Sequence, residues 1–112
     1  MFDAAFFDGM KPSAYFINTS RGPVVNEPDL IAALQSGQIA GAGLDVFEQE
    51  PTPMDNPLLD MDNVVLTPHT ASYADQTMLV RNRRMAEDAV RICHGGESEF
   101  VANRAVLPKR RK

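Results

Sequence analysis

A short helix with well-marked ends, set between two apolar runs, constrains the fold of this chain more than any other feature. Residues 26–37 begin with Asn26, a residue type that favours the N-cap position, and end at Gly37, which favours helix termination. Apolar, partly β-branched runs at residues 14–17 and 42–47 flank this segment and are typical of short buried strands. The pattern predicts a βαβ unit with two parallel strands and a right-handed crossover.

The remaining segments continue the same α/β pattern. Residues 64–66 predict a third short strand, and the proline-rich residues 49–57 predict the loop that leads to it. Residues 2–10 predict a short N-terminal helix. With Ser72 as the expected N-cap, apolar residues recur at helical spacing and predict one long helix at about residues 72–94.

The composition argues against several kinds of partner. A net charge of −4 over 112 residues disfavours nucleic acid and membrane surfaces as partners of the body of the chain. The sequence shows neither a targeting pattern nor an apolar stretch of membrane-spanning length. With Cys93 as the single cysteine we expect no internal disulfide, no metal site and a cytoplasmic location. The basic residues 108–112 are expected to form a solvated terminus.

Three ionisable residues stand at the carboxyl ends of the predicted strands. Arg21 follows the first strand, Asp45 lies late in the second, and His69 follows the third. Ligands of open α/β sheets bind outside these strand ends, so the three side chains are expected to share one crevice if the third strand is also parallel. Each residue taken alone also has a structural explanation: Arg21 could be a turn residue, Asp45 a strand cap and His69 a structural histidine. Asp45 in an apolar strand needs a ligand or a backbone donor as a partner, because burying an unpaired charge costs on the order of several kcal/mol.

Four sequence blocks resemble the signature blocks of the D-isomer-specific 2-hydroxyacid dehydrogenases. Their order and spacing are similar from about residue 10 to residue 73, and more loosely to the end. The blocks are residues 18–22, 43–47, 50–51 and 67–69.

The resemblance implies a homodimeric, two-domain enzyme in which a Rossmann-type domain is inserted between two parts of a smaller, flavodoxin-like substrate domain. The expected fold class is α/β: the C-terminal half of a Rossmann-type doubly wound parallel sheet, followed by a long helix and a tail. Residues 1–94 would form part of the NAD(P)-binding domain and include the long helix. Residues 95–112 would form a tail that returns to an absent substrate domain.

By the same resemblance, Arg21 binds the substrate carboxylate, His69 is the acid/base and Glu50 is the carboxylate that pairs with His69. Imidazole exchanges a proton near neutral pH, and an adjacent carboxylate stabilises its protonated form. A forked, permanently charged arginine can bind a carboxylate through two hydrogen bonds. Glu48 is the alternative partner of the histidine, and only the family pattern of glutamate before proline favours Glu50.

The resemblance also implies a set of contacts to the nicotinamide cofactor, NAD or NADP. Asp45 would hold the carboxamide group. Thr19 and Ser20 would contact the nicotinamide end of the cofactor, and the alternative is that they only form hydrogen bonds within their own turn. Ser72 stands where relatives often have glycine, which adds a side chain near the expected cofactor. His94 is interpreted as a residue that favours a helix C-terminus and not as a second catalytic base. The expected cofactor-binding residues are Thr19, Ser20, Arg21, Asp45, His69 and Ala71.

A phosphate-binding Gly-x-Gly-x-x-Gly loop does not occur in the sequence, nor does the residue that would choose between NAD and NADP. We therefore expect the 112 residues alone to be inactive and to expose an apolar sheet edge. The function indicated is hydride transfer between NAD(P) and a small D-2-hydroxy acid or 2-keto acid. Two alternatives stay open: a non-catalytic module that resembles the dinucleotide-binding corepressors, and an inactive truncated product.

Overall fold

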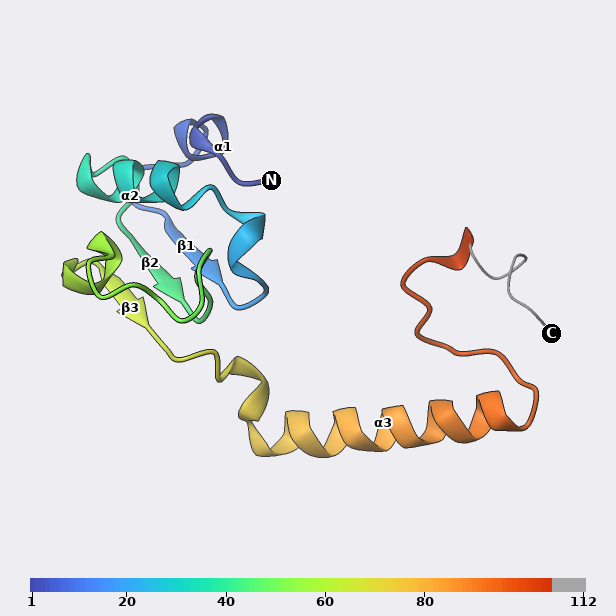
Figure 1. Ribbon diagram of the computed structural model, residues 1–112. Helices are drawn as coiled ribbons and strands as arrows, with labels where there is room; N and C mark the ends of the chain where they lie inside the picture. Colours follow the sequence, from blue (N-terminus) through green and yellow to red (C-terminus); the bar gives the residue numbers. More distant parts are fainter. Residues whose placement is uncertain (106–112) are drawn as a thin grey trace. The chain divides into compact units, whose positions relative to one another are not determined.

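The computed structural model describes residues 1–105, which divide into two compact units, Met1–Ser72 and the residues from Tyr73 onward (Figure 1). Each unit is described by itself. The basic segment 108–112, predicted to be a solvated terminus, lies outside the described residues.

The first unit contains a three-stranded parallel sheet in the order β1-β2-β3, as the sequence predicts. Leu44, the last residue of β2, pairs with Asn18 on one side and with Leu66 on the other. Both neighbouring strands end at this level, so β2 stops there and the prediction that it continues to residue 47 is wrong. The strands are β1 (Tyr15–Asn18), β2 (Gly41–Leu44) and β3 (Val64–Leu66).

Two helices of this unit, α1 (Ala4–Asp8) and α2 (Glu27–Gln35), lie side by side (Figure 1). Both have the side-chain caps that their sequences favour: Asp3 accepts a hydrogen bond from the N–H of Phe6, and Asn26 accepts one from that of Asp29. The helices form the core together with one face of the sheet and the 3-10 turn Pro57–Asp60. The largest fully buried side chains of this core are Phe7, Leu30, Ile39 and Leu58.

Residues of the first unit leave the opposite face of the sheet uncovered. Tyr15, Ile17 and Val65 are about two-thirds exposed or more, at 69%, 71% and 71%. The sequence predicts an exposed apolar edge of the sheet, and these three exposed residues lie on one of its faces.

The second unit contains the long helix α3 (Asp75–Cys93). Ala74 occupies its N-cap position, and Ser72 belongs to a 3-10 turn, so the prediction that Ser72 caps this helix is wrong. Near its C-terminal end, Asp88 accepts hydrogen bonds from the hydroxyl of Ser98 and the N–H of Glu99. No helix among residues 1–105 is both long and apolar enough to cross a membrane.

Candidate active site

The turn after β1 is organised by Asn18, whose side chain is buried. Its Oδ1 atom accepts a hydrogen bond of 3.0 Å from the Ser20 N–H, and its Nδ2 atom donates one of 3.1 Å to the Arg21 carbonyl. This turn leaves Thr19, Ser20 and Arg21 exposed at the carboxyl end of β1. The Arg21 guanidinium donates through Nη1 to the Ser20 carbonyl at 2.7 Å.

Gly22 allows the backbone of this turn to lie directly against the chain that leaves β2. A Cβ atom at this position would stand 1.7 Å from the carbonyl oxygen of Phe47 and 2.5 Å from the nitrogen of Glu48. No side chain can occupy that space. The segment carrying Arg21 and the segment leading to Glu50 are therefore in backbone contact.

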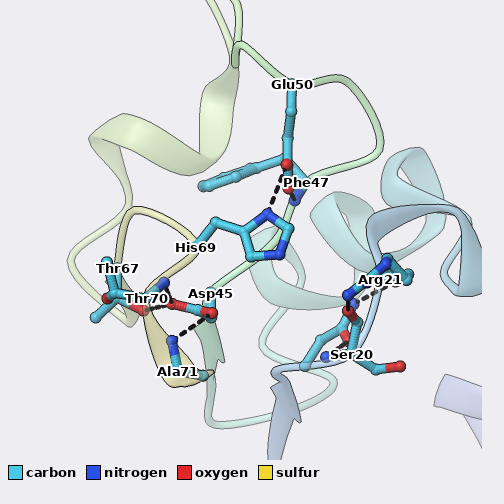
Figure 2. A network of polar contacts seen from close by, with 10 residues as sticks. Ser20, Arg21, Asp45, Phe47, Glu50, Thr67, His69, Thr70 and Ala71 are labelled. Atoms are coloured by element: carbon cyan, nitrogen blue, oxygen red, sulfur yellow. Dashed lines mark hydrogen bonds and ion pairs between the residues drawn. The ribbon is translucent and has the colours of Figure 1, made fainter. Parts of the chain in front are cut away.

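The loop after β3 presents His69 with a left-handed backbone, φ 55°, a conformation that is uncommon for residues other than glycine. Buried Asp45, only 3% exposed, holds this loop with its carboxylate. It accepts hydrogen bonds from the Thr67 hydroxyl at 2.5 Å, the Thr70 N–H at 2.8 Å and the Ala71 N–H at 2.9 Å (Figure 2). The partner that a charge in this position requires is thus supplied by the chain itself.

Glu50, and not Glu48, is the carboxylate that lies against the histidine. His69 Nδ1 is 2.8 Å from Glu50 Oε2, and Glu50 Oε1 accepts a 3.0 Å hydrogen bond from the Phe47 N–H. Figure 2 shows the imidazole ring projecting from its loop toward Glu50, with the turn that carries Arg21 nearby. Both side chains of the pair are partly exposed, at 47% for His69 and 38% for Glu50.

The hydrogen bonds of these two carboxylates lower their pKa values. The pKa of Asp45 lies below its ordinary value chiefly because of the Thr67 hydroxyl, with further lowering by the two backbone N–H groups and His69. The pKa of Glu50 is lowered first by the Phe47 N–H, then by its hydrogen bond to His69, with smaller contributions from the charges of His69 and Arg21. Burial opposes the lowering at both sites. Both groups therefore remain ionised at neutral pH.

The arrangement leaves one imidazole nitrogen available for chemistry. With Nδ1 on Glu50, Nε2 has no hydrogen-bond partner among residues 1–105. An exposed imidazole oriented by a carboxylate can give or take a proton, and the nearby guanidinium can bind an anion. Within the same described residues, no group of three or more His, Cys, Asp or Glu is arranged to hold a metal ion.

Sequence reasoning missed three residues that organise this site. Asn18 shapes the Arg21 turn, Thr67 bonds to Asp45, and the carboxylate of Glu27 accepts a hydrogen bond from the Glu48 N–H at 2.9 Å. Asn18, directly after the predicted strand at residues 14–17, could have been recognised as a turn-forming residue. The other two contacts join residues 21 or more positions apart, and no local pattern signals them.

The parallel sheet with helices against one face places the chain among Rossmann-type α/β proteins. The family described as D-isomer specific 2-hydroxyacid dehydrogenase, NAD binding domain, matches residues 1–71. The chain belongs to this family.

One similar protein is glyoxylate/hydroxypyruvate reductase B of Citrobacter koseri, 62% identical over 77 residues, which are 69% of this chain and 24% of that protein. The chain therefore spans about a quarter of the length of the curated relatives that it matches.

Solved structures show the same likeness. A D-isomer specific 2-hydroxyacid dehydrogenase from Xanthobacter autotrophicus, in complex with NADPH and MES, is 46% identical with a TM-score of 0.75; the match covers 88% of this chain and 40% of that one. An NADPH-dependent glyoxylate/hydroxypyruvate reductase from Sinorhizobium meliloti, in complex with NADP and sulfate, is 33% identical with a TM-score of 0.76 and coverage of 93% and 34%.

Proposed function

We propose that this chain supplies the acid/base and substrate-binding groups of an NAD(P)-dependent oxidoreductase that interconverts a small D-2-hydroxy acid and its 2-keto acid. The observation that carries the proposal is the 2.8 Å contact between His69 Nδ1 and Glu50 Oε2, which leaves Nε2 open. The similar reductases that act on glyoxylate and hydroxypyruvate support a small 2-keto acid as substrate.

His69 is the proposed proton donor for reduction of the keto group. A bound nicotinamide would supply the hydride to the C2 carbon, and the proton on Nε2 would pass to the C2 oxygen. Glu50 stabilises the imidazolium before transfer and fixes the orientation of the ring through Nδ1. In the oxidation direction, neutral His69 takes the proton from the hydroxyl group.

Arg21 is the proposed binding group for the substrate carboxylate. One of its nitrogens bonds to the Ser20 carbonyl, which leaves further N–H donors for a bidentate contact. Its positive charge also stabilises negative charge that develops on the C2 oxygen in the transition state. Arg21 would thus bind the substrate and support the chemistry.

The residues at the strand ends fit a nicotinamide group, either NAD or NADP. Asp45 Oδ2 accepts one hydrogen bond, from the Ala71 N–H, and a carboxylate oxygen can accept a second from a carboxamide. Exposed Thr19 and Ser20, with Arg21, His69 and Ala71, complete the proposed contact set. Residues 1–94 would belong to the dinucleotide-binding domain and 95–112 to the returning tail of a cytoplasmic homodimer.

A chimera tests this function directly. Residues 1–71, the segment that matches the family, would replace the corresponding segment of the Citrobacter koseri reductase. We expect the chimera to oxidise NADH or NADPH in the presence of glyoxylate or hydroxypyruvate, and to lose this activity with His69→Ala. A folded chimera that binds the nucleotide but reduces none of a panel of 2-keto acids would overturn the proposal in favour of a non-catalytic binding module.

A further inference from the structure

The loop that carries Glu50 has few hydrogen bonds between its own residues. It leaves β2 at Leu44 and runs to the 3-10 turn that begins at Pro57. Two of its residues, Pro51 and Pro53, are prolines, which have no N–H to donate. An acid/base carboxylate on such a loop needs anchors from outside it.

One external anchor is Glu27, the first residue of α2, which is half-buried. Its Oε2 atom accepts a 2.9 Å hydrogen bond from the Glu48 N–H, at the start of the loop. Its Oε1 atom accepts a 2.7 Å hydrogen bond from Asn56 Nδ2, at the end of the loop. A single carboxylate therefore joins both ends of the loop to the helix.

The two groups that donate hydrogen bonds to Glu27 lie beside further contacts, one with the core and one with Glu50. Asn56 Oδ1 also accepts a hydrogen bond from the N–H of Leu58, whose side chain is fully buried in the core. At the other end, the Glu48 N–H that bonds to Glu27 is next in sequence to the Phe47 N–H that bonds to Glu50 Oε1. Glu27 thus fixes the peptide adjacent to the one that orients Glu50.

We infer that Glu27 is a positioning residue for the acid/base pair: by holding the Glu48 N–H and the Asn56 amide, its carboxylate keeps Glu50 against His69. Glu27 makes no contact with the reacting groups itself. The inference rests on the proposed function for the role of Glu50 and His69 in proton transfer. The hydrogen bonds by which Glu27 holds the loop are present in this chain whether or not it is catalytic.

The role requires a carboxylate, because two donors face two acceptor oxygens. Glutamine at position 27 offers one acceptor oxygen, and its NH₂ group would meet one of the donors. Rotation of the Asn56 amide would not restore the pair, since Asn56 Oδ1 is already committed to Leu58. Glu27→Gln therefore loses at least one of the two anchors without adding bulk.

The test is to measure the pKa of the Glu50 carboxyl by NMR titration in the 112-residue chain, with and without Glu27→Gln. Loss of the anchor should weaken the contacts with Phe47 and His69 that lower this pKa, so it should rise toward its ordinary value. Simple removal of a negative charge would have the opposite effect and lower it. The direction of the change therefore separates positioning from electrostatics.

Hydrogen exchange gives a second readout at the anchor itself. The Glu48 amide should exchange about tenfold faster in Glu27→Gln, as expected for loss of a hydrogen bond to a charged group. Glu48→Gln is the matched control, because it removes an exposed charge from the loop and keeps the Glu48 N–H.

Asn56→Ser provides a variant that leaves the charge of Glu27 in place. Serine can still cap the N–H of Leu58 but is too short to reach Glu27, so a smaller rise in the Glu50 pKa is expected. An unchanged or lowered Glu50 pKa in Glu27→Gln, with Glu48 exchange as in the control, would overturn the inference. Neither measurement needs turnover, so an inactive chimera would count against the proposed function and leave this result standing.

Discussion

The carboxylate of Asp45 holds the loop that carries His69 from both sides of the histidine. It accepts one hydrogen bond from Thr67, two residues before His69, and two from the backbone N–H groups of Thr70 and Ala71, directly after it. Because His69 itself has a left-handed backbone, its conformation depends on these flanking contacts. Asp45 therefore supports the histidine whether or not it also meets a cofactor.

Asp45→Asn should weaken this support. Asparagine has a single acceptor oxygen and turns an NH₂ group toward one of the three donors, so one hydrogen bond of the loop is lost. We expect a lower Tm by circular dichroism in the chain and slower turnover in the chimera, with the larger effect on kcat. An unchanged Tm would show that the three contacts do not support the loop.

The parts of the fold that depend on residues close together in the sequence could be predicted. Asn26 and Gly37 define the ends of α2 through local capping and turn chemistry, and the structure confirms that helix. The length of β2 could not be predicted from its apolar residues, since it is set by where β1 and β3 end. Residues 45–47 are buried although they lie outside the strand, and Phe47 belongs to the hydrophobic core.

The charged residues of the candidate site could be placed near one another from their positions at strand ends, but their partners could not. The family resemblance assigns Asp45 to the cofactor, and the residues alone leave open either a ligand or a backbone donor as its partner. Its donors lie 22 to 26 positions away. Glu27 shows no motif, and its contact with Asn56 spans 29 positions. Long-range hydrogen bonds of this kind depend on the folded loops, which periodicity and capping rules do not describe.

Acid should destabilise the first unit in a defined direction. Asp45 and Glu50 have pKa values lowered from their ordinary 3.8 and 4.5, so their contribution to stability is fully present above those values. It is lost as pH falls through the lower, folded-state pKa values. Urea midpoints should stay level from pH 7 to about 5 and fall below about pH 4. Circular dichroism suits the measurement because the sequence has no tryptophan.

The acid titration also has a matched comparison. In Asp45→Asn the decline of the urea midpoint below about pH 4 should be shallower, since one of the shifted carboxyls is gone. A decline as steep as that of the parent chain would assign the acid sensitivity to other groups, such as Asp88, whose pKa is also lowered.

Replacement of the proposed acid/base pair should affect turnover to different degrees. In the chimera, His69→Ala removes the proton donor and should lower kcat by about 10²- to 10⁴-fold. Glu50→Gln keeps the histidine and should have a smaller effect on kcat. Glu48→Gln should behave like the parent protein, because the exposed Glu48 side chain lies outside the pair. Equal losses in Glu48→Gln and Glu50→Gln would contradict the assignment of Glu50.

Arg21→Lys keeps the positive charge of the proposed substrate-binding group but removes the planar fork. A bidentate contact with the substrate carboxylate cannot form, so kcat/KM for glyoxylate should fall by about ten- to a hundredfold. Because Arg21 also belongs to the proposed nicotinamide contact set, the KM for the nucleotide is measured alongside and should change less than the KM for glyoxylate. A loss confined to nucleotide binding would contradict the role of Arg21 in binding the substrate carboxylate.

Gly22→Ala tests whether the backbone contact between the Arg21 turn and the loop of Glu50 is required for the fold. The added Cβ would overlap the carbonyl oxygen of Phe47, and relief requires the two segments to separate. Overpacking of this kind costs roughly 1–3 kcal/mol of unfolding free energy, and here it also displaces both functional segments. Gly9→Ala is the matched control, since its Cβ meets its nearest neighbour at an ordinary 3.5 Å. If both variants unfold at the same urea concentration, the two segments have room to move, and the close approach at Gly22 does not constrain the site.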